Sequence, residues 1–251
     1  MFSREVVILY RKELRQLARS KNALAASLVL PLFLMVIVPL LVSSIPGGHG
    51  PSMHHGGEIP SWLPGLRDLG PDASAGLLRF MLPIFVAITA LVTPTVAAGY
   101  TLVQERETRT LDLLVALPVR VGQILLAKLL AIVTVAGGAT TVLFAIDAVV
   151  ALRRGAGPGW VAALFFLLVA GLSFSTASAL LISLLAKDFR SAQSVTGFLI
   201  APSIFLTTGM NVLVPGPPAL RVLALGAVFL AMAAAALAIS LRVVTFERLL
   251  R

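Results

Sequence analysis

Long apolar runs separated by short polar segments dominate the chain and predict a helical membrane protein. A transmembrane helix needs about 20 consecutive, mostly apolar residues. Six stretches meet this requirement: residues 23–45, 77–102, 122–150, 160–186, 192–214 and 221–243. Since no soluble segment reaches the roughly 50 residues of a small domain, we predict one all-α membrane domain with six transmembrane helices over residues 1–251.

The fifth span, 192–214, contains residues that favour a break. Pro202, Gly209 and Asn211 lie within it, and "PGPP" follows at 215–218. Two interpretations stay open: a continuous span, or a span followed by a re-entrant segment that other helices shield from lipid. The third and fourth spans are long for one crossing, so they are expected to tilt or to project into water.

The N-terminal segment 1–22 has the pattern of an amphipathic interfacial helix. Apolar side chains recur every three or four residues on one face: Phe2, Val6, Leu9, Tyr10, Leu14 and Leu17. Basic side chains share the other face: Arg4, Arg11, Arg15 and Arg19. Such a helix suits the inner headgroup layer of a membrane. It serves either as an anchor for the first span or, in addition, as a border to a cytoplasmic partner.

Composition and charge agree with a membrane protein and exclude a nucleic-acid partner. The chain is 58% apolar and 12% charged, with a mean hydropathy of +0.99, whereas a soluble domain is about half apolar and a quarter charged. With both termini cytoplasmic, 15 basic residues lie in inner segments and 5 in outer ones. This positive-inside bias accounts for the net charge of +9 through topology and membrane lipids. We expect a multi-pass protein of the plasma (inner) membrane.

The outer loop 46–76 carries the weak metal candidates His49, His54 and His55, together with Glu58. These are ligand types for zinc or copper, but a glycine-rich loop fixes no coordination geometry. We therefore favour a solvated loop and predict no metal site.

Motifs for catalysis in this chain are absent from the sequence. It has no G-x-x-x-x-G-K-[ST] phosphate loop, no G-x-S-x-G and no H-E-x-x-H, so no nucleotide or other cofactor is expected here. Asp147 is the one carboxylate within a predicted span, near its outer end, where a snorkelling or locally paired side chain is favoured over a proton relay. Hydroxyl residues line the spans midway: Thr89, Thr93, Thr95, Thr140 and Ser175. Helix packing is the favoured role, and a translocation path for an apolar or amphipathic cargo is the alternative.

The charged segment 104–118, "QERETRTLDLLVALP", interrupts the apolar pattern between spans two and three. On a helix, Glu105, Arg109 and Asp112 share one face at i, i+4 and i+7. Leucines such as Leu114 form the other side, and Pro118 ends the helix. The pattern predicts a short amphipathic helix across the cytoplasmic mouth of the bundle.

This segment resembles the signature of the ABC-2 type transporter permeases. Matching positions are Glu105, Glu107, Thr110, Leu111, Leu113, Leu114 and Pro118. Asp112 stands where the family usually has Glu, and Arg109 where it usually has Gly. The resemblance extends more weakly over the chain, through the basic N-terminal helix, the six spans and the proline-containing fifth span.

The resemblance implies a role in ATP-driven transport, most often export. The chain would pair with a second permease, identical or different, and with two cytoplasmic ATP-binding subunits that hold ATP and Mg²⁺. Segment 104–118 would be the cytoplasmic coupling helix in contact with those subunits through Glu105, Glu107, Arg109, Thr110, Asp112 and Leu114, with Pro118 at its end. Two alternatives stay open: a membrane-embedded interaction or assembly protein without transport, and an integral membrane enzyme that modifies lipids.

Overall fold

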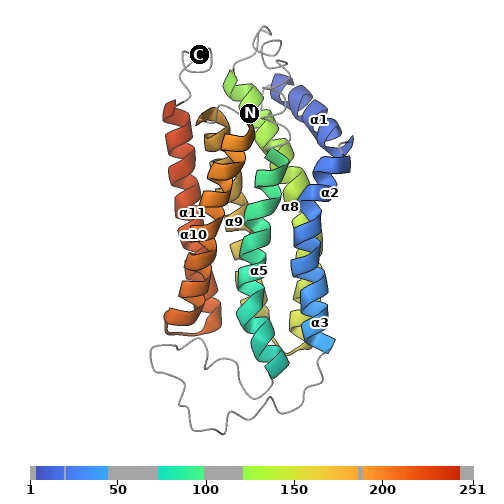
Figure 1. Cartoon of the computed structure of the whole chain (residues 1–251), viewed down its shortest axis with the longest axis vertical. Helices are drawn as coiled ribbons and strands as arrows, with labels where there is room; N and C mark the ends of the chain where they lie inside the picture. The colour runs from blue at the N-terminus through green and yellow to red at the C-terminus, as the bar shows by residue number, and fades with distance from the viewer. Residues whose placement is uncertain (1–3, 20, 45–72, 99–120, 186–188, 244–251) are drawn as a thin grey trace.

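The computed structural model describes residues 4–19, 21–44, 73–98, 121–185 and 189–243 (Figure 1). Within these residues the chain is helical apart from two tight turns and contains no strand. The helices are α1 (Arg4–Arg19), α2 (Lys21–Leu32), α3 (Val38–Ser44), α5 (Ala73–Ala98), α8 (Val121–Arg153), α9 (Pro158–Leu185), α10 (Phe189–Leu213) and α11 (Pro218–Val243). The predicted all-α class is confirmed for this part of the chain.

Five helical stretches are long and apolar enough to cross a membrane. They are Ser27–Ser44, Ala75–Ala97, Ala127–Arg153, Pro158–Ala179 and Pro218–Ser240, and they coincide with the first, second, third, fourth and sixth predicted spans. Helix α10 has 25 residues, which corresponds to roughly 37 Å. Its apolar portion is the shorter stretch Ile200–Leu213, so a sixth crossing stays a prediction.

The first span is a continuous rod built from three helical pieces. A π-helical segment, Phe33–Ile37, joins α2 to α3, and the Val38 N–H donates to the Phe33 carbonyl. Pro39 follows directly. A proline ring clashes with the carbonyl four residues earlier and supplies no N–H, so a wider turn just before it accommodates the ring without ending the helix.

Two helical hairpins close the bundle at the end away from α1 (Figure 1). At the end of α8, Gly155 has φ +76°, its N–H donates to Leu152 O, and the Ala156 N–H donates to Ala151 O. This is the Schellman arrangement, in which a left-handed residue terminates the helix. Helix α9 then begins at Pro158, a favoured first helical residue.

The turn between α10 and α11 corrects one expectation. Helix α10 continues through Pro202 to Leu213, and residues 214–217 lead directly to α11 at Pro218. The described residues therefore contain no re-entrant segment after the fifth span. The "PGPP" sequence supplies a hairpin turn instead, with Gly216 at φ +125°.

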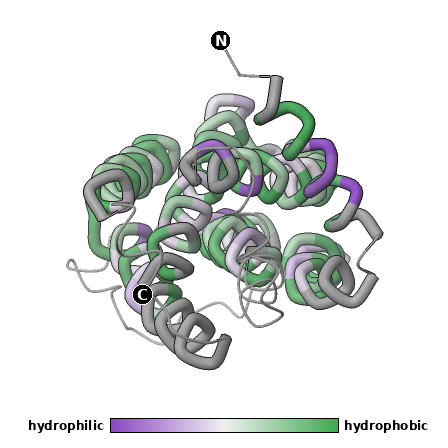
Figure 2. The backbone as a smooth tube through the Cα atoms, turned by 90° about the horizontal axis from the view of Figure 1, so that it is seen from above, coloured by the Kyte–Doolittle hydropathy of each residue, from purple (hydrophilic) through white to green (hydrophobic). Residues whose placement is uncertain are grey.

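Helix α5 lies inside the bundle and packs against α2, α8, α9 and α10, while α11 packs mainly on α9. Hydrophobic residues prevail along the spans, and hydrophilic ones are concentrated on α1 (Figure 2). Glycines allow the closest approaches: a Cβ placed on Gly171 of α9 would lie 2.7 Å from the Ala90 Cβ of α5. Small residues at helix crossings are the usual means of close packing in membranes.

Candidate functional site at the α1 end of the bundle

Helix α1 packs extensively against α8. Val6, Glu13 and Leu17 are buried on one face. Leu17 joins an apolar cluster with Ala97 of α5, Ala131 and Ile132 of α8, and Ala179 of α9. The α1 end of the bundle, where this helix lies, also holds the end of α5 and the beginning of α8 (Figure 1).

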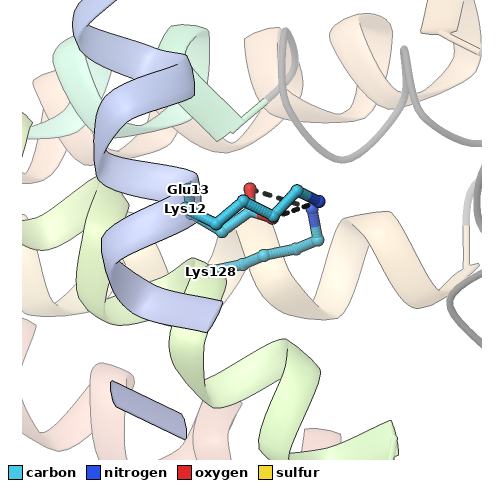
Figure 3. A network of polar contacts seen from close by, with 3 residues as sticks. All are labelled: Lys12, Glu13 and Lys128. Atoms are coloured by element: carbon cyan, nitrogen blue, oxygen red, sulfur yellow. Dashed lines mark hydrogen bonds and ion pairs between the residues drawn. The ribbon is translucent and has the colours of Figure 1, made fainter. Parts of the chain in front are cut away.

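A buried ion pair joins the two helices (Figure 3). Lys128 Nζ of α8 lies 3.1 Å from Glu13 Oε2 of α1, and the two side chains are 2% and 3% exposed. Lys12, whose side chain is 50% exposed, lies 3.3 Å from the other carboxylate oxygen. Removing one partner of a buried pair leaves an uncompensated charge and typically costs about 3–5 kcal/mol. Lys128 and Glu13 therefore depend on each other.

A second polar contact links the same helices. The Tyr10 hydroxyl donates to Thr134 Oγ1 over 3.1 Å, and Thr134 in turn donates to the Leu130 carbonyl of its own helix at 2.7 Å. Together with the ion pair, it attaches α1 to α8 at two positions about 9 Å apart along α8, at 1.5 Å per residue.

The apolar face of α1 meets protein, which changes the interfacial-helix prediction. The helix itself is confirmed from Arg4 to Arg19, but its buried face contacts the bundle rather than lipid. The outward face carries the exposed residues Arg11 and Arg15, together with Val7 and Ile8 at 41% and 63% exposure. This outward face is left for lipid headgroups or a partner.

The predicted coupling residues lie outside the described residues. Glu105, Glu107, Arg109, Thr110, Asp112, Leu114 and Pro118 all fall within 99–120. The described chain ends at Ala98 in α5 and resumes at Val121 in α8, both at the α1 end (Figure 1). The charged segment is thus joined at each side to a helix that reaches the region where α1 packs.

The hydroxyl residues singled out in the spans lie inside the bundle. Thr89, Thr93, Thr140 and Ser175 are at most 1% exposed, and Thr95 is half-buried. Thr93 and Thr140 donate to carbonyls of their own helices, those of Thr89 and Ala136. The Thr89 hydroxyl is buried and has no hydrogen-bond partner in the described part of the chain.

Two of these hydroxyls donate to a carbonyl beside a proline in α5. Pro94 has no N–H, so the carbonyl four residues earlier has no helical donor, and hydroxyl donors bond the carbonyl that follows it. The Leu91 carbonyl accepts from Ser175 Oγ of α9 at 2.6 Å and from Thr95 Oγ1 at 2.9 Å. Ser175 therefore fastens α9 to α5 at the proline.

A carbonyl beside the other α5 proline, Pro83, also accepts a hydrogen bond from a side chain of another helix. The Phe80 carbonyl, again three residues before the proline, accepts from Asn211 Nδ2 of α10 at 2.9 Å. The Asn211 carbonyl accepts from Arg221 Nη1 of α11 at 3.3 Å. Asn211 thus links α10 to both neighbours near the end away from α1.

Arginines at this far end bind the carbonyl ends of helices, where positive charge is favourable. Arg79 Nη2 donates to the Gly155 carbonyl after α8 at 3.3 Å, and Arg221 bonds the end of α10. These contacts explain two of the basic residues that run against the positive-inside bias.

Asp147, in contrast, is not locally paired as expected. It is 1% exposed, and neither carboxylate oxygen has a hydrogen-bond partner among the residues that the structure describes.

The histidines His49, His54 and His55 lie outside the described residues. Among the residues that the structure does describe, no group of three or more His, Cys, Asp or Glu could hold a metal ion.

The Glu13–Lys128 pair is the feature that the sequence prediction missed, although a signal was present. Lys128 interrupts the apolar run "ILLAKLLAIV", and Glu13 lies between Tyr10 and Leu17 on the apolar face of α1. A charge embedded in an apolar run requires a partner, and these two are the complementary ones.

A comparison with curated proteins gives no match. A comparison with protein families matches residues 4–213 to the family described as ABC-2 type transporter. The matched region begins with α1, includes the α1–α8 contact and extends to the end of α10. The chain is thus a multi-pass membrane component of a transporter that associates with ABC ATP-binding subunits, and it belongs to the ABC-2 type transporter family.

Proposed function

We propose that this chain is the permease subunit of an ATP-driven exporter, and that segment 104–118 is the coupling helix that two cytoplasmic ATP-binding subunits contact. The observation that carries the proposal is the arrangement at the α1 end. Helix α1 is attached by a buried ion pair to α8, the helix that follows this charged segment in the chain. Because α1 and α8 are held together, a force from a cytoplasmic neighbour on this end can be transferred to the spans.

The orientation follows from charge. With the α1 end in the cytoplasm, both termini are cytoplasmic and the 15-to-5 distribution of basic residues obeys the positive-inside rule. The outward face of α1 carries Arg11 and Arg15, which then face anionic headgroups.

The described interior supports a permease better than an ion-driven carrier. Asp147 is the only carboxylate within the five described membrane spans, whereas ion pathways usually contain several ionisable groups. We assign Ser175 to helix packing, because it donates from α9 to a carbonyl of α5. We assign Thr93, Thr95 and Thr140 to backbone bonding within their own helices. A second permease copy or relative completes the transporter, with ATP and Mg²⁺ bound in the ATP-binding subunits.

The proposal is tested by reversing the charges of the coupling segment. The Glu105→Lys, Asp112→Lys variant is purified with the ATP-binding subunit, and ATP hydrolysis is measured in reconstituted vesicles. We expect normal insertion but loss of the stimulation that the permease exerts on hydrolysis. The matched control is Glu58→Lys, Asp68→Lys in the predicted outer loop, which changes the net charge by the same amount. Equal hydrolysis in both double variants contradicts the proposed contact.

A further inference from the structure

Two helical units meet at the α1 end. One is α1 with α2, which begins two residues after α1 ends and starts the first span. The other is α8, which begins three residues after Pro118, the predicted end of the coupling helix. A displacement of the coupling helix reaches α5 and α8 along the backbone. It reaches α1 and the first span only through side-chain contacts, those of α1 with α8 and those of α2 with α5 among them.

The ion pair is the buried charged contact among them. Glu13 and Lys128 are almost wholly buried and 3.1 Å apart, in an environment where an unpaired charge is poorly tolerated. Apolar contacts of Leu17 with Ala131 and Ile132 lie beside them. Pulling α1 away from α8 would separate these two buried charges in a largely apolar surrounding and leave Glu13 with the exposed Lys12, so the contact resists separation.

We propose that the Glu13–Lys128 ion pair clamps α1 to the cytoplasmic part of α8, so that the first and third spans move together when the ATP-binding subunits close. Glu13 and Lys128 are positioning residues, since neither lies in the predicted contact segment. The inference rests on the proposed function and adds a route to it: force that enters at 104–118 reaches the first span through α1.

The chain offers a matched control for the clamp. Lys12 binds the other carboxylate oxygen of Glu13 at 3.3 Å, but its side chain is 50% exposed, and exposed pairs contribute little. Lys12→Gln therefore removes an ion pair to the same glutamate while leaving the buried pair intact. Glu13→Gln removes both pairs and differs from the natural side chain by little more than its charge.

The experiment measures the stimulation of ATP hydrolysis by the permease in purified complexes with the ATP-binding subunit. We expect Glu13→Gln to reduce the stimulation, expressed per assembled complex, about fivefold or more. Lys12→Gln leaves it unchanged. The exchange Glu13→Lys, Lys128→Glu restores the pair and the stimulation.

A reversible tether separates clamping from folding. The chain has no cysteine, so Tyr10→Cys, Thr134→Cys introduces the only thiols, at the second polar contact between the helices. A reducible bifunctional thiol reagent is used, because a disulfide requires Cα atoms within about 7 Å and a tyrosine side chain separates the two backbones here. In the Glu13→Gln background, the tether should restore the stimulation, and reduction should abolish it again.

The outcomes distinguish the clamp from the function on which it rests. Full stimulation by Glu13→Gln, or no recovery on tethering, overturns the clamp and leaves the proposed function standing. A natural chain that neither binds nor stimulates the ATP-binding subunit overturns the proposed function, and the clamp with it. Loss in Glu13→Gln with recovery by tether supports both.

Discussion

The close approach of α5 and α9 at Gly171 makes a sharp prediction about packing. A Cβ at position 171 would lie 2.7 Å from the Cβ of Ala90, whereas carbon atoms in contact are about 3.5–4.0 Å apart. Gly171→Ala therefore forces the two helices apart by about 1 Å at this point. Overpacking of this kind costs about 1–3 kcal/mol.

The control is Gly138→Ala on α8, where an added Cβ meets no atom within 4 Å. Both substitutions improve the intrinsic helix preference by about 1 kcal/mol, so this gain cancels in the comparison. We expect Gly171→Ala to be less stable than Gly138→Ala by about 1–3 kcal/mol. The separation also weakens the nearby hydrogen bond from Ser175 to the Leu91 carbonyl.

The assay is reversible unfolding in detergent micelles with increasing denaturing detergent, followed by tryptophan fluorescence, since Trp160 is buried in the core. A second substitution makes the test specific. Ala90→Gly removes the atom that Gly171→Ala would strike, so the double variant should recover about 0.5–3 kcal/mol relative to the sum of the single changes. Equal stability of the two alanine variants, or strict additivity in the double variant, refutes the packing argument.

Three further predictions concern buried polar groups, each read from the same unfolding assay. Asn211→Leu should destabilise the chain more than Ser175→Ala, because the carbonyl that accepts from Ser175 keeps a second donor, Thr95. Each hydrogen bond is worth about 0.6–1.7 kcal/mol. The reverse order of stability contradicts the account. Asp147→Asn should stabilise the monomeric chain, because the Asp147 carboxylate has no hydrogen-bond partner among the described residues. The gain should be less than the roughly 2.5–3.5 kcal/mol of a charge at mid-membrane, and destabilisation would reveal a partner. Lys128→Met alone should lower the free energy of unfolding by about 3–5 kcal/mol, and the double variant Lys128→Met, Glu13→Gln should recover much of that loss. Equal losses in the single and the double variant mean that the pair is not buried as described.

Much of the fold could be predicted from the sequence, because a membrane imposes a strong length requirement on each apolar run. Five predicted spans coincide with described helices. The hairpin at 215–218 was harder, since the proline and glycine residues that could break the fifth span also serve a tight turn between two complete helices. Sequence alone gives no means to choose between these uses.

The candidate site was predicted less completely, because its contacts are long-range. Glu13 and Lys128 are 115 positions apart, and charge patterns within one helix do not show which distant residue is the partner. The apolar face of α1 suggested lipid for the same reason: periodicity indicates that a face is buried but not what covers it. The charged signature at 104–118, on the other hand, is local, and its family resemblance agrees with the family match.

The claim that segment 104–118 faces the cytosol and contacts an ATP-binding subunit can be tested with one thiol, because the chain has no cysteine of its own. Arg106→Cys is fitted with a short photoactivatable cross-linker in inverted membrane vesicles that contain the complete transporter, with Asp68→Cys in the predicted outer loop as control. The account predicts that the reagent reaches Arg106→Cys from the cytoplasmic face and captures the ATP-binding subunit, while Asp68→Cys does neither. Labelling of Arg106→Cys from the external face, or efficient labelling from inside that never captures that subunit, would contradict it.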